Sequence, residues 1–112
     1  DTLCYRADPD EPLWKRQQAE WEPLLAACEA REGIRLQRVS GIIHRPQHPE
    51  ALSRLRRRLD GLNAFSLAAL TTLTSLAASL VIGLAALEPE ADGEALWRAA
   101  NLEEDWQAVL WG

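Results

Sequence analysis

Two histidines four residues apart are the first candidates for chemistry in this sequence of 112 residues. His44 and His48 have the separation that places two imidazoles on one face of a helix, as in zinc sites of the HExxH type. Pro46 lies between them, however, and interrupts the helix that such a site requires. Because no third ligand lies nearby, the sequence predicts no metal site and no cofactor.

Two cysteines, Cys4 and Cys28, are the candidates for thiol chemistry. Two cysteines do not make a disulfide scaffold at this length, so we expect reduced thiols. Cys28 falls on the apolar face of a predicted helix, which favours a core position over a nucleophile. The sequence also lacks a nucleophile elbow, a phosphate-binding loop and a glycine-rich dinucleotide turn. We therefore predict that the protein is not an enzyme.

A basic cluster follows Pro49. It consists of Arg54, Arg56, Arg57 and Arg58. A solvated helix face explains such a cluster, and a contact with an acidic partner surface or with another domain of the protein is the alternative. The net charge of −5 disfavours binding to nucleic acid and to anionic membranes.

The closing segment combines carboxylates with tryptophans. Glu103, Glu104 and Asp105 stand in the first turn of a predicted helix, where the helix dipole favours negative charge. Three of the five tryptophans lie in this part of the chain: Trp97, Trp106 and Trp111. Exposed tryptophan beside fixed carboxylates is typical of a protein-binding surface, and core tryptophan is the alternative.

These candidates must be positioned around Gly61–Leu87, a run without a charged residue. Leucines recur in it every three or four residues, which predicts one long helix with a buried stripe. The stripe consists of Leu67, Leu70, Leu73, Leu76, Leu80, Leu84 and Leu87. About 20 apolar residues also suffice to cross a bilayer, so a membrane-associated subunit is one alternative. The missing aromatic belt and the acidic residues that follow the run favour a core helix, with no membrane partner.

Helices are predicted on both sides of this run. One ends at Gly33 and has a kink or break near Trp21 and Glu22, imposed by Pro23. Another begins at Pro49, and two short helices close the chain. Residues 34–43 half-alternate between apolar and polar, which predicts at most a short β-hairpin.

The composition is that of a folded globular protein, with 47% hydrophobic and 26% charged residues. At this length we expect one domain over residues 1–112. The predicted fold is mainly α, a small irregular helical bundle around one long apolar helix. Because the chain begins at Asp1 and contains no methionine, we expect it to be a fragment of a longer protein.

Three stretches together resemble a known family. They are LCYRA with the downstream WEPLL, then SLVIGLAAL, and finally LEEDWQAVLWG, the most specific of the three. They are similar to the C-terminal helical domain of the assembly chaperones for F-type ATP synthase, found in mitochondria and in alpha-class proteobacteria. The resemblance implies a two-domain protein whose N-terminal β-rich domain is absent here. It also implies a partner, the free alpha subunit of the catalytic sector, which is kept from aggregating until it pairs with beta.

The resemblance further implies which residues bind the partner. The functionally sensitive acidic residue of the family matches Glu103, and the other predicted partner-binding residues are Glu104, Trp106, Gln107, Trp111 and Gly112. Family members continue beyond Gly112 with an acidic helical tail. Many of them also have glycine where this chain has Ala78, a change that we expect a helix to tolerate. The family places the protein in the bacterial cytoplasm, or in the mitochondrial matrix of a eukaryote.

A further alternative is a scaffold domain that makes no contact with a client. Its partner would then be the missing N-terminal domain of the same protein.

Overall fold

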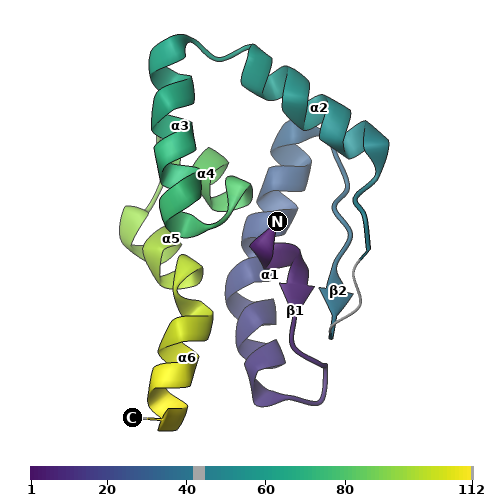
Figure 1. The fold of residues 1–112 in the computed structure, drawn as a ribbon, viewed down its shortest axis with the longest axis vertical. Coiled ribbons are helices and arrows are strands. Elements are labelled where there is room, and N and C mark those ends of the chain that lie inside the picture. The colour runs from purple at the N-terminus through teal and green to yellow at the C-terminus, as the bar shows by residue number, and fades with distance from the viewer. Residues whose placement is uncertain (42–44, 112) are drawn as a thin grey trace.

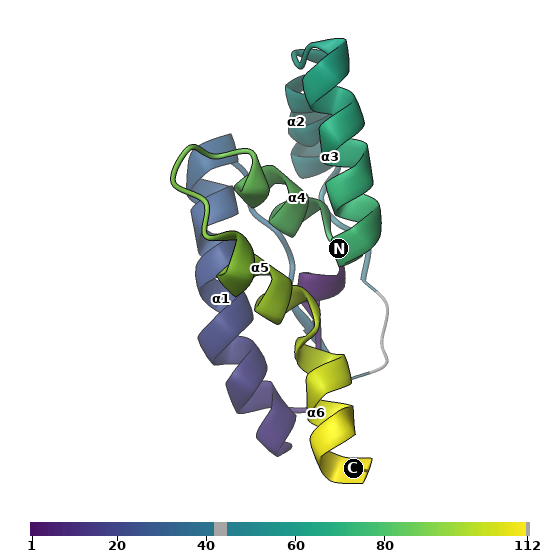
Figure 2. The ribbon, with the colours of Figure 1, turned by 90° about the vertical axis from the view of Figure 1, so that its left-hand side faces the viewer.

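The structure is a computed structural model, and it describes residues 1–41 and 45–111. The fold is mainly helical, as predicted (Figure 1). In chain order the elements are η1 (Thr2–Cys4), β1 (Tyr5–Arg6), α1 (Pro12–Glu32), β2 (Val39–Ser40), α2 (Pro49–Asp60), α3 (Ala64–Ala77), α4 (Leu80–Ala86), α5 (Gly93–Ala100) and α6 (Leu102–Trp111). The molecule is elongated, with α2 and the start of α3 at one end and α6 at the other (Figures 1 and 2).

The core lies between α1 and the short helix α4. Four buried residues of α1 recur at helical spacing: Gln17, Trp21, Leu25 and Cys28. They form one stripe because residues three and four apart share a helix face. Trp21 also donates its indole Nε1–H to the carbonyl of Ala99 at 2.8 Å, which ties α1 to the end of α5. The prediction that Cys28 belongs to the core is therefore confirmed.

The predicted long helix over Gly61–Leu87 is wrong, because α3 and α4 are separate helices. Ala78 ends α3 in the left-handed conformation, with φ 55°. The Ser79 hydroxyl then begins α4 by accepting the N–H of Ile82 at 3.1 Å. The carboxylate of Asp1 accepts the N–H of Val81 at 3.0 Å and the Ser79 hydroxyl at 2.9 Å, so the N-terminus stabilises the break.

The leucine stripe does not form a single buried face either. Leu67 and Leu76 on α3 are 40% and 65% exposed, whereas Leu84 on α4 is buried. In the part of the chain that the structure describes, no helix is long and apolar enough to cross a membrane.

Alanine at position 78, where many family members have glycine, costs more folding stability than expected, because this residue is not helical but left-handed. A left-handed conformation costs an L-residue other than glycine roughly 1 kcal/mol, and glycine is the usual residue at a helix C-terminus of this kind. We predict that Ala78→Gly raises the free energy of unfolding by about 1 kcal/mol in urea denaturation. Ala77→Gly is the matched control, because Ala77 is helical and glycine there should destabilise by a similar amount. A loss of stability in Ala78→Gly would contradict the proposed strain.

The hairpin predicted over residues 34–43 is not tested as a whole, but the described residues there include one strand of a pair that the sequence did not predict. β2 pairs with β1 in parallel, with Tyr5 opposite Val39 and Arg6 opposite Ser40. Burial of Leu3 and Cys4, just before β1, holds this strand on the core beside β2. Ile42 and Ile43 of the predicted hairpin lie outside the described residues.

The predicted break at Pro23 does not occur, since α1 is one helix from Pro12 to Glu32. Pro23 lies on the exposed side of α1, where water can hydrogen-bond the Ala19 carbonyl that loses its helical donor. The helix ends at Gly33 as predicted, with φ 67°.

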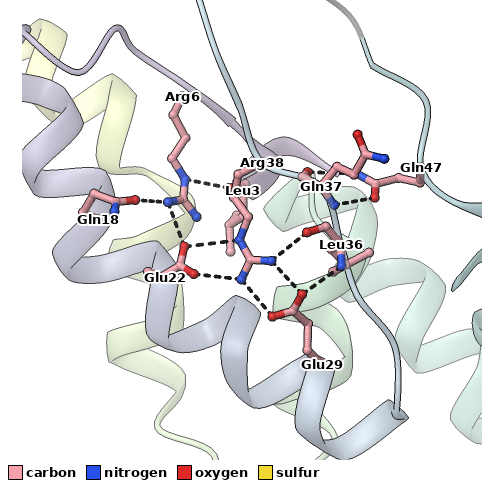
Figure 3. Close-up of polar contacts among 9 residues, drawn as sticks. All are labelled: Leu3, Arg6, Gln18, Glu22, Glu29, Leu36, Gln37, Arg38 and Gln47. Carbon is pink, nitrogen blue, oxygen red and sulfur yellow. Dashed lines mark hydrogen bonds and ion pairs between the residues drawn. The ribbon is translucent and has the colours of Figure 1, made fainter.

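A network of ion pairs fastens both strands to α1 (Figure 3). Arg38 lies between Glu22 and Glu29, with N–O distances of 2.8 Å and 2.6 Å. The buried Arg6 reaches the other oxygen of Glu22 at 2.9 Å and donates from Nε to the Leu3 carbonyl. Arg6 belongs to β1 and Arg38 directly precedes β2, so the network fixes the strand pair on the helix surface.

Candidate protein-binding site

The closing helix α6 lies beside the N-terminal half of α1 (Figures 1 and 2). Between them and β1 is a cleft of about 590 Å³. Its lining residues are Tyr5, Arg6, Ala7, Leu13, Gln17, Gly41, Glu103, Glu104 and Gln107. The structure thus brings three of the six predicted partner-binding residues, Glu103, Glu104 and Gln107, to one cleft.

Glu103 is held in this cleft by a chain of hydrogen bonds. Gln17 donates from Nε2 to Glu103 Oε1 at 3.1 Å, and its own Oε1 accepts the backbone N–H of Ala7 at 2.9 Å. Gln17 is fully buried, whereas Glu103 is exposed, so the Gln17 side of this bond is shielded from bulk water and the carboxylate side is not. The carboxylate of Glu103 is therefore positioned by α1 and by the segment after β1.

The surroundings of Glu103 in the cleft also shift the pKa of its carboxyl. Partial burial against α1 raises the pKa of the Glu103 carboxyl above its usual value, and the hydrogen bond from Gln17 opposes that rise. The negative charge of Glu104 adds to the rise. No ion pair with Glu103 or Glu104 exists within residues 1–41 and 45–111. The two carboxylates are thus available to cationic groups of another protein.

The remaining predicted residues lie farther along α6. Trp106 is half-buried, and Trp111 is 85% exposed while its Nε1–H donates to Gln107 Oε1 at 2.8 Å. Gly112 lies outside the described residues. Val109 and Leu110, which the sequence did not single out, are 81% and 62% exposed beside Trp111. The end of α6 therefore presents an apolar tip next to the acidic cleft.

Gln17 is the site residue that sequence reasoning missed. The signal was its position, four residues before Trp21 on the buried stripe of α1, where a polar residue needs a hydrogen-bond partner. The identity of that partner, Glu103, could not be read from the sequence because the two residues are 86 positions apart.

The tryptophans divide between core and surface. Trp21 is 1% exposed, whereas Trp97 is 55% exposed on α5. Trp97 borders a small apolar cavity of about 130 Å³ with Leu76 of α3. A second apolar area thus lies on the α3 and α5 side of the molecule.

The cysteines and the possible metal ligands do not form a reactive site in the described part of the chain. Cys4 and Cys28 are buried free thiols, and burial raises the pKa of both, so neither resembles a reactive thiolate. Among the described residues no three acidic, histidine or cysteine side chains form a cluster able to hold a metal ion. His44 lies outside the described residues, so the histidine pair is not tested.

Comparison with known proteins gives related sequences and structures. No protein-family model matches the chain. The mitochondrial protein atp12 of Schizosaccharomyces pombe is 30% identical over 103 residues, which are 89% of this chain and 35% of that protein. The crystal structure of Atp12 from Paracoccus denitrificans matches all of this chain and 48% of its own, with 35% identity and a TM-score of 0.93.

Two further solved structures agree with this match. A Paracoccus denitrificans Atp12 variant with lysine in place of one aspartate gives the same identity and TM-score. The candidate chaperone Atu1473 from Agrobacterium tumefaciens is 41% identical, with a TM-score of 0.90 over all of this chain and 42% of its own. The chain therefore spans about a third of the curated relative and less than half of the solved ones.

Proposed function

We propose that this chain, which matches part of Atp12 in sequence and in structure, is the C-terminal helical domain of a two-domain assembly chaperone. Its client would be the free alpha subunit of the F-type ATP synthase, which it keeps from aggregating until alpha pairs with beta. The homology carries this proposal, since it extends through every element of the fold. The protein would work in the bacterial cytoplasm, or in the mitochondrial matrix of a eukaryote.

The match to Atp12 also bears on catalysis. Proteins of the family that the sequence resembles are chaperones, and the match confirms the prediction that this chain is not an enzyme.

The surface around α6 supports client binding. An unpaired subunit exposes apolar area that is later buried against its partner, and such area aggregates. The exposed tip of Val109, Leu110 and Trp111 offers apolar contact, and the carboxylates of Glu103 and Glu104 form a polar rim beside it. In this proposal the binding is weak enough for the beta subunit to displace the chaperone by competition.

Glu103→Lys tests the site. The substitution places a cation where Gln17 donates, so it repels the Gln17 amide and reverses the charge of the cleft. We expect suppression of alpha-subunit aggregation, measured by light scattering, to require about tenfold more protein, with an unchanged helical circular dichroism spectrum.

The matched control is Asp105→Lys, which makes the same charge change in the same helical turn but outside the lining of the cleft. Its effect should be less than about threefold. If both variants protect the alpha subunit like the parent chain, the site is wrong. If the folded parent chain neither binds nor protects the alpha subunit, the alternative of a scaffold domain without client contact is supported instead.

A further inference from the structure

The arginines of α2 form a charged surface that the proposed function does not use. This helix turns its apolar side inward, burying Ala51 and packing Leu55 and Leu59 against the core. Arg56 and Arg57 lie on the opposite, exposed side. The surface is at the end of the molecule away from α6 (Figures 1 and 2), so it is separate from the cleft around Glu103.

Internal pairing accounts for only part of this charge. Arg58 pairs with Glu32 of α1 at 3.2 Å, and Arg54 pairs loosely with the exposed Glu50 at 3.7 Å. Arg56 and Arg57 make no ion pair with any residue that the structure describes. Two cations are therefore left to the solvent or to a partner.

Helix stability does not explain the cluster either. Like charges three or four residues apart, such as Arg54 with Arg57 and Arg58, destabilise a helix by a few tenths of a kcal/mol per pair. The helix dipole favours cations in the last turn, which holds Arg57 and Arg58. It gives no comparable benefit to Arg54 or Arg56.

The basic surface continues beyond α2. A groove of about 510 Å³ runs between the start of α2 and the segment after α1, and both Arg35 and Arg54 line it. Arg54 Nη1 lies close over Gly33, only 3.2 Å from where a Cβ would be. We define the arginine face as Arg35, Arg54, Arg56 and Arg57; all four are exposed. Arg54 and Arg57, three residues apart, share one side of α2, and Arg56 extends the charge around the solvent side of the helix.

We propose that the arginine face docks a carboxylate-rich segment of a partner protein. Charge complementarity supports this occupant, because a planar guanidinium pairs with a carboxylate through two parallel hydrogen bonds. Leu52, 51% exposed one turn before Arg56, adds an apolar contact beside the charges. The inference does not depend on the proposed function, since it concerns a different surface.

Two other classes of partner fit less well. Nucleic acid is repelled by the net charge of −5, and no aromatic side chain belongs to the arginine face to stack on a base. A membrane-bound helix buries its apolar side in the lipid, whereas α2 uses Leu55 and Leu59 for its own core.

Fluorescence anisotropy with a fluorescein-labelled Glu/Ser peptide of about 12 residues tests the proposal at about 50 mM salt, where exposed charges are weakly screened. We expect saturable binding that is at least tenfold weaker in Arg56→Glu/Arg57→Glu, and no binding of the matching Gln/Ser peptide. The control is Lys15→Glu/Arg16→Glu, an adjacent pair of cations on α1 that is also exposed, which should change the affinity by less than about threefold.

Several results would overturn the proposal. They are absence of binding, equal weakening in both double variants, or tighter binding of single-stranded DNA of the same length. Sedimentation velocity supplies the remaining test. A dimer that dissociates in Arg56→Glu/Arg57→Glu would identify a second copy of this chain as the occupant instead. Circular dichroism checks that the variants fold, and Arg56→Gln/Arg57→Gln replaces the charge reversal if they do not.

Discussion

Gly83→Ala is expected to lower the free energy of unfolding by about 2 kcal/mol. A Cβ at Gly83 would lie 2.5 Å from Thr74 Oγ1 and 3.1 Å from Leu70 Cδ1, where α4 packs closely against α3. The backbone N of Thr74 lies at 3.4 Å, an ordinary contact distance, so the overlap is with the side chains of Thr74 and Leu70. Overpacking of this kind costs up to about 3 kcal/mol, and the better helix propensity of alanine returns about 1 kcal/mol.

Thermal unfolding followed by circular dichroism measures this loss, and two variants control it. Gly93→Ala should be nearly neutral, because nothing lies within 4 Å of the position its Cβ would take. Thr74→Ala should rescue Gly83→Ala, because it removes the clashing hydroxyl, which is buried without a hydrogen-bond partner. A Gly83→Ala protein as stable as the parent would show that α3 and α4 do not approach so closely.

The contact at Gly83 also shows what the sequence could not reveal. Hydrophobic periodicity predicted helix on both sides of Ala78 correctly, since leucine spacing is a local property. The break between α3 and α4 depends on the carboxylate of Asp1, which is remote in sequence and hydrogen-bonds Ser79 and Val81. A serine within an apolar run also fits a continuous helix, so only the tertiary contact decides between the two structures.

The candidate site could likewise be predicted from the sequence only in its residue types and not in its spatial arrangement. The acidic turn and the tryptophans of α6 were recognisable from residue types alone. The place of these residues in the fold could not be recognised, because the cleft forms only when β1 and α1 bring Ala7 and Gln17 beside Glu103. The parallel strand pair was missed for a similar reason. A strand of two residues has almost no sequence signal, and β1 and β2 are joined through a whole helix.

Arg38→Met should give the second large effect: it should lower the free energy of unfolding by about 2 kcal/mol at neutral pH. Arg38 donates to both Glu22 and Glu29 and to the Leu36 carbonyl at 2.7 Å. Without it the two carboxylates keep their charge but lose the guanidinium that neutralises them. The expected loss is below the 3–5 kcal/mol typical of a fully buried pair, because Glu22 and Arg38 are partly exposed.

The effect of Arg38→Met should depend on pH. Hydrogen bonds from Arg38 hold the pKa of Glu29 below its usual value, and those from Arg38 and Arg6 do the same for Glu22 although partial burial acts against them. Carboxyls with a lowered pKa stabilise the fold above the unfolded pKa of about 4.3, and that stability is lost as the pH falls through the folded value. The stability difference between parent and variant should therefore be largest above pH of about 5 and shrink toward pH of about 3.

Urea denaturation at a series of pH values, followed by tryptophan fluorescence, measures this difference. Arg16→Met is the control, since Arg16 forms an exposed pair with Glu20 at 3.2 Å on the same helix. It should cost less than about 0.5 kcal/mol at any pH. A stability difference for Arg38→Met that does not change with pH would mean that Arg38 stabilises the fold by packing and not by its charge. The strands would then be fastened to α1 by Leu3 and Cys4 instead of by the ion pairs.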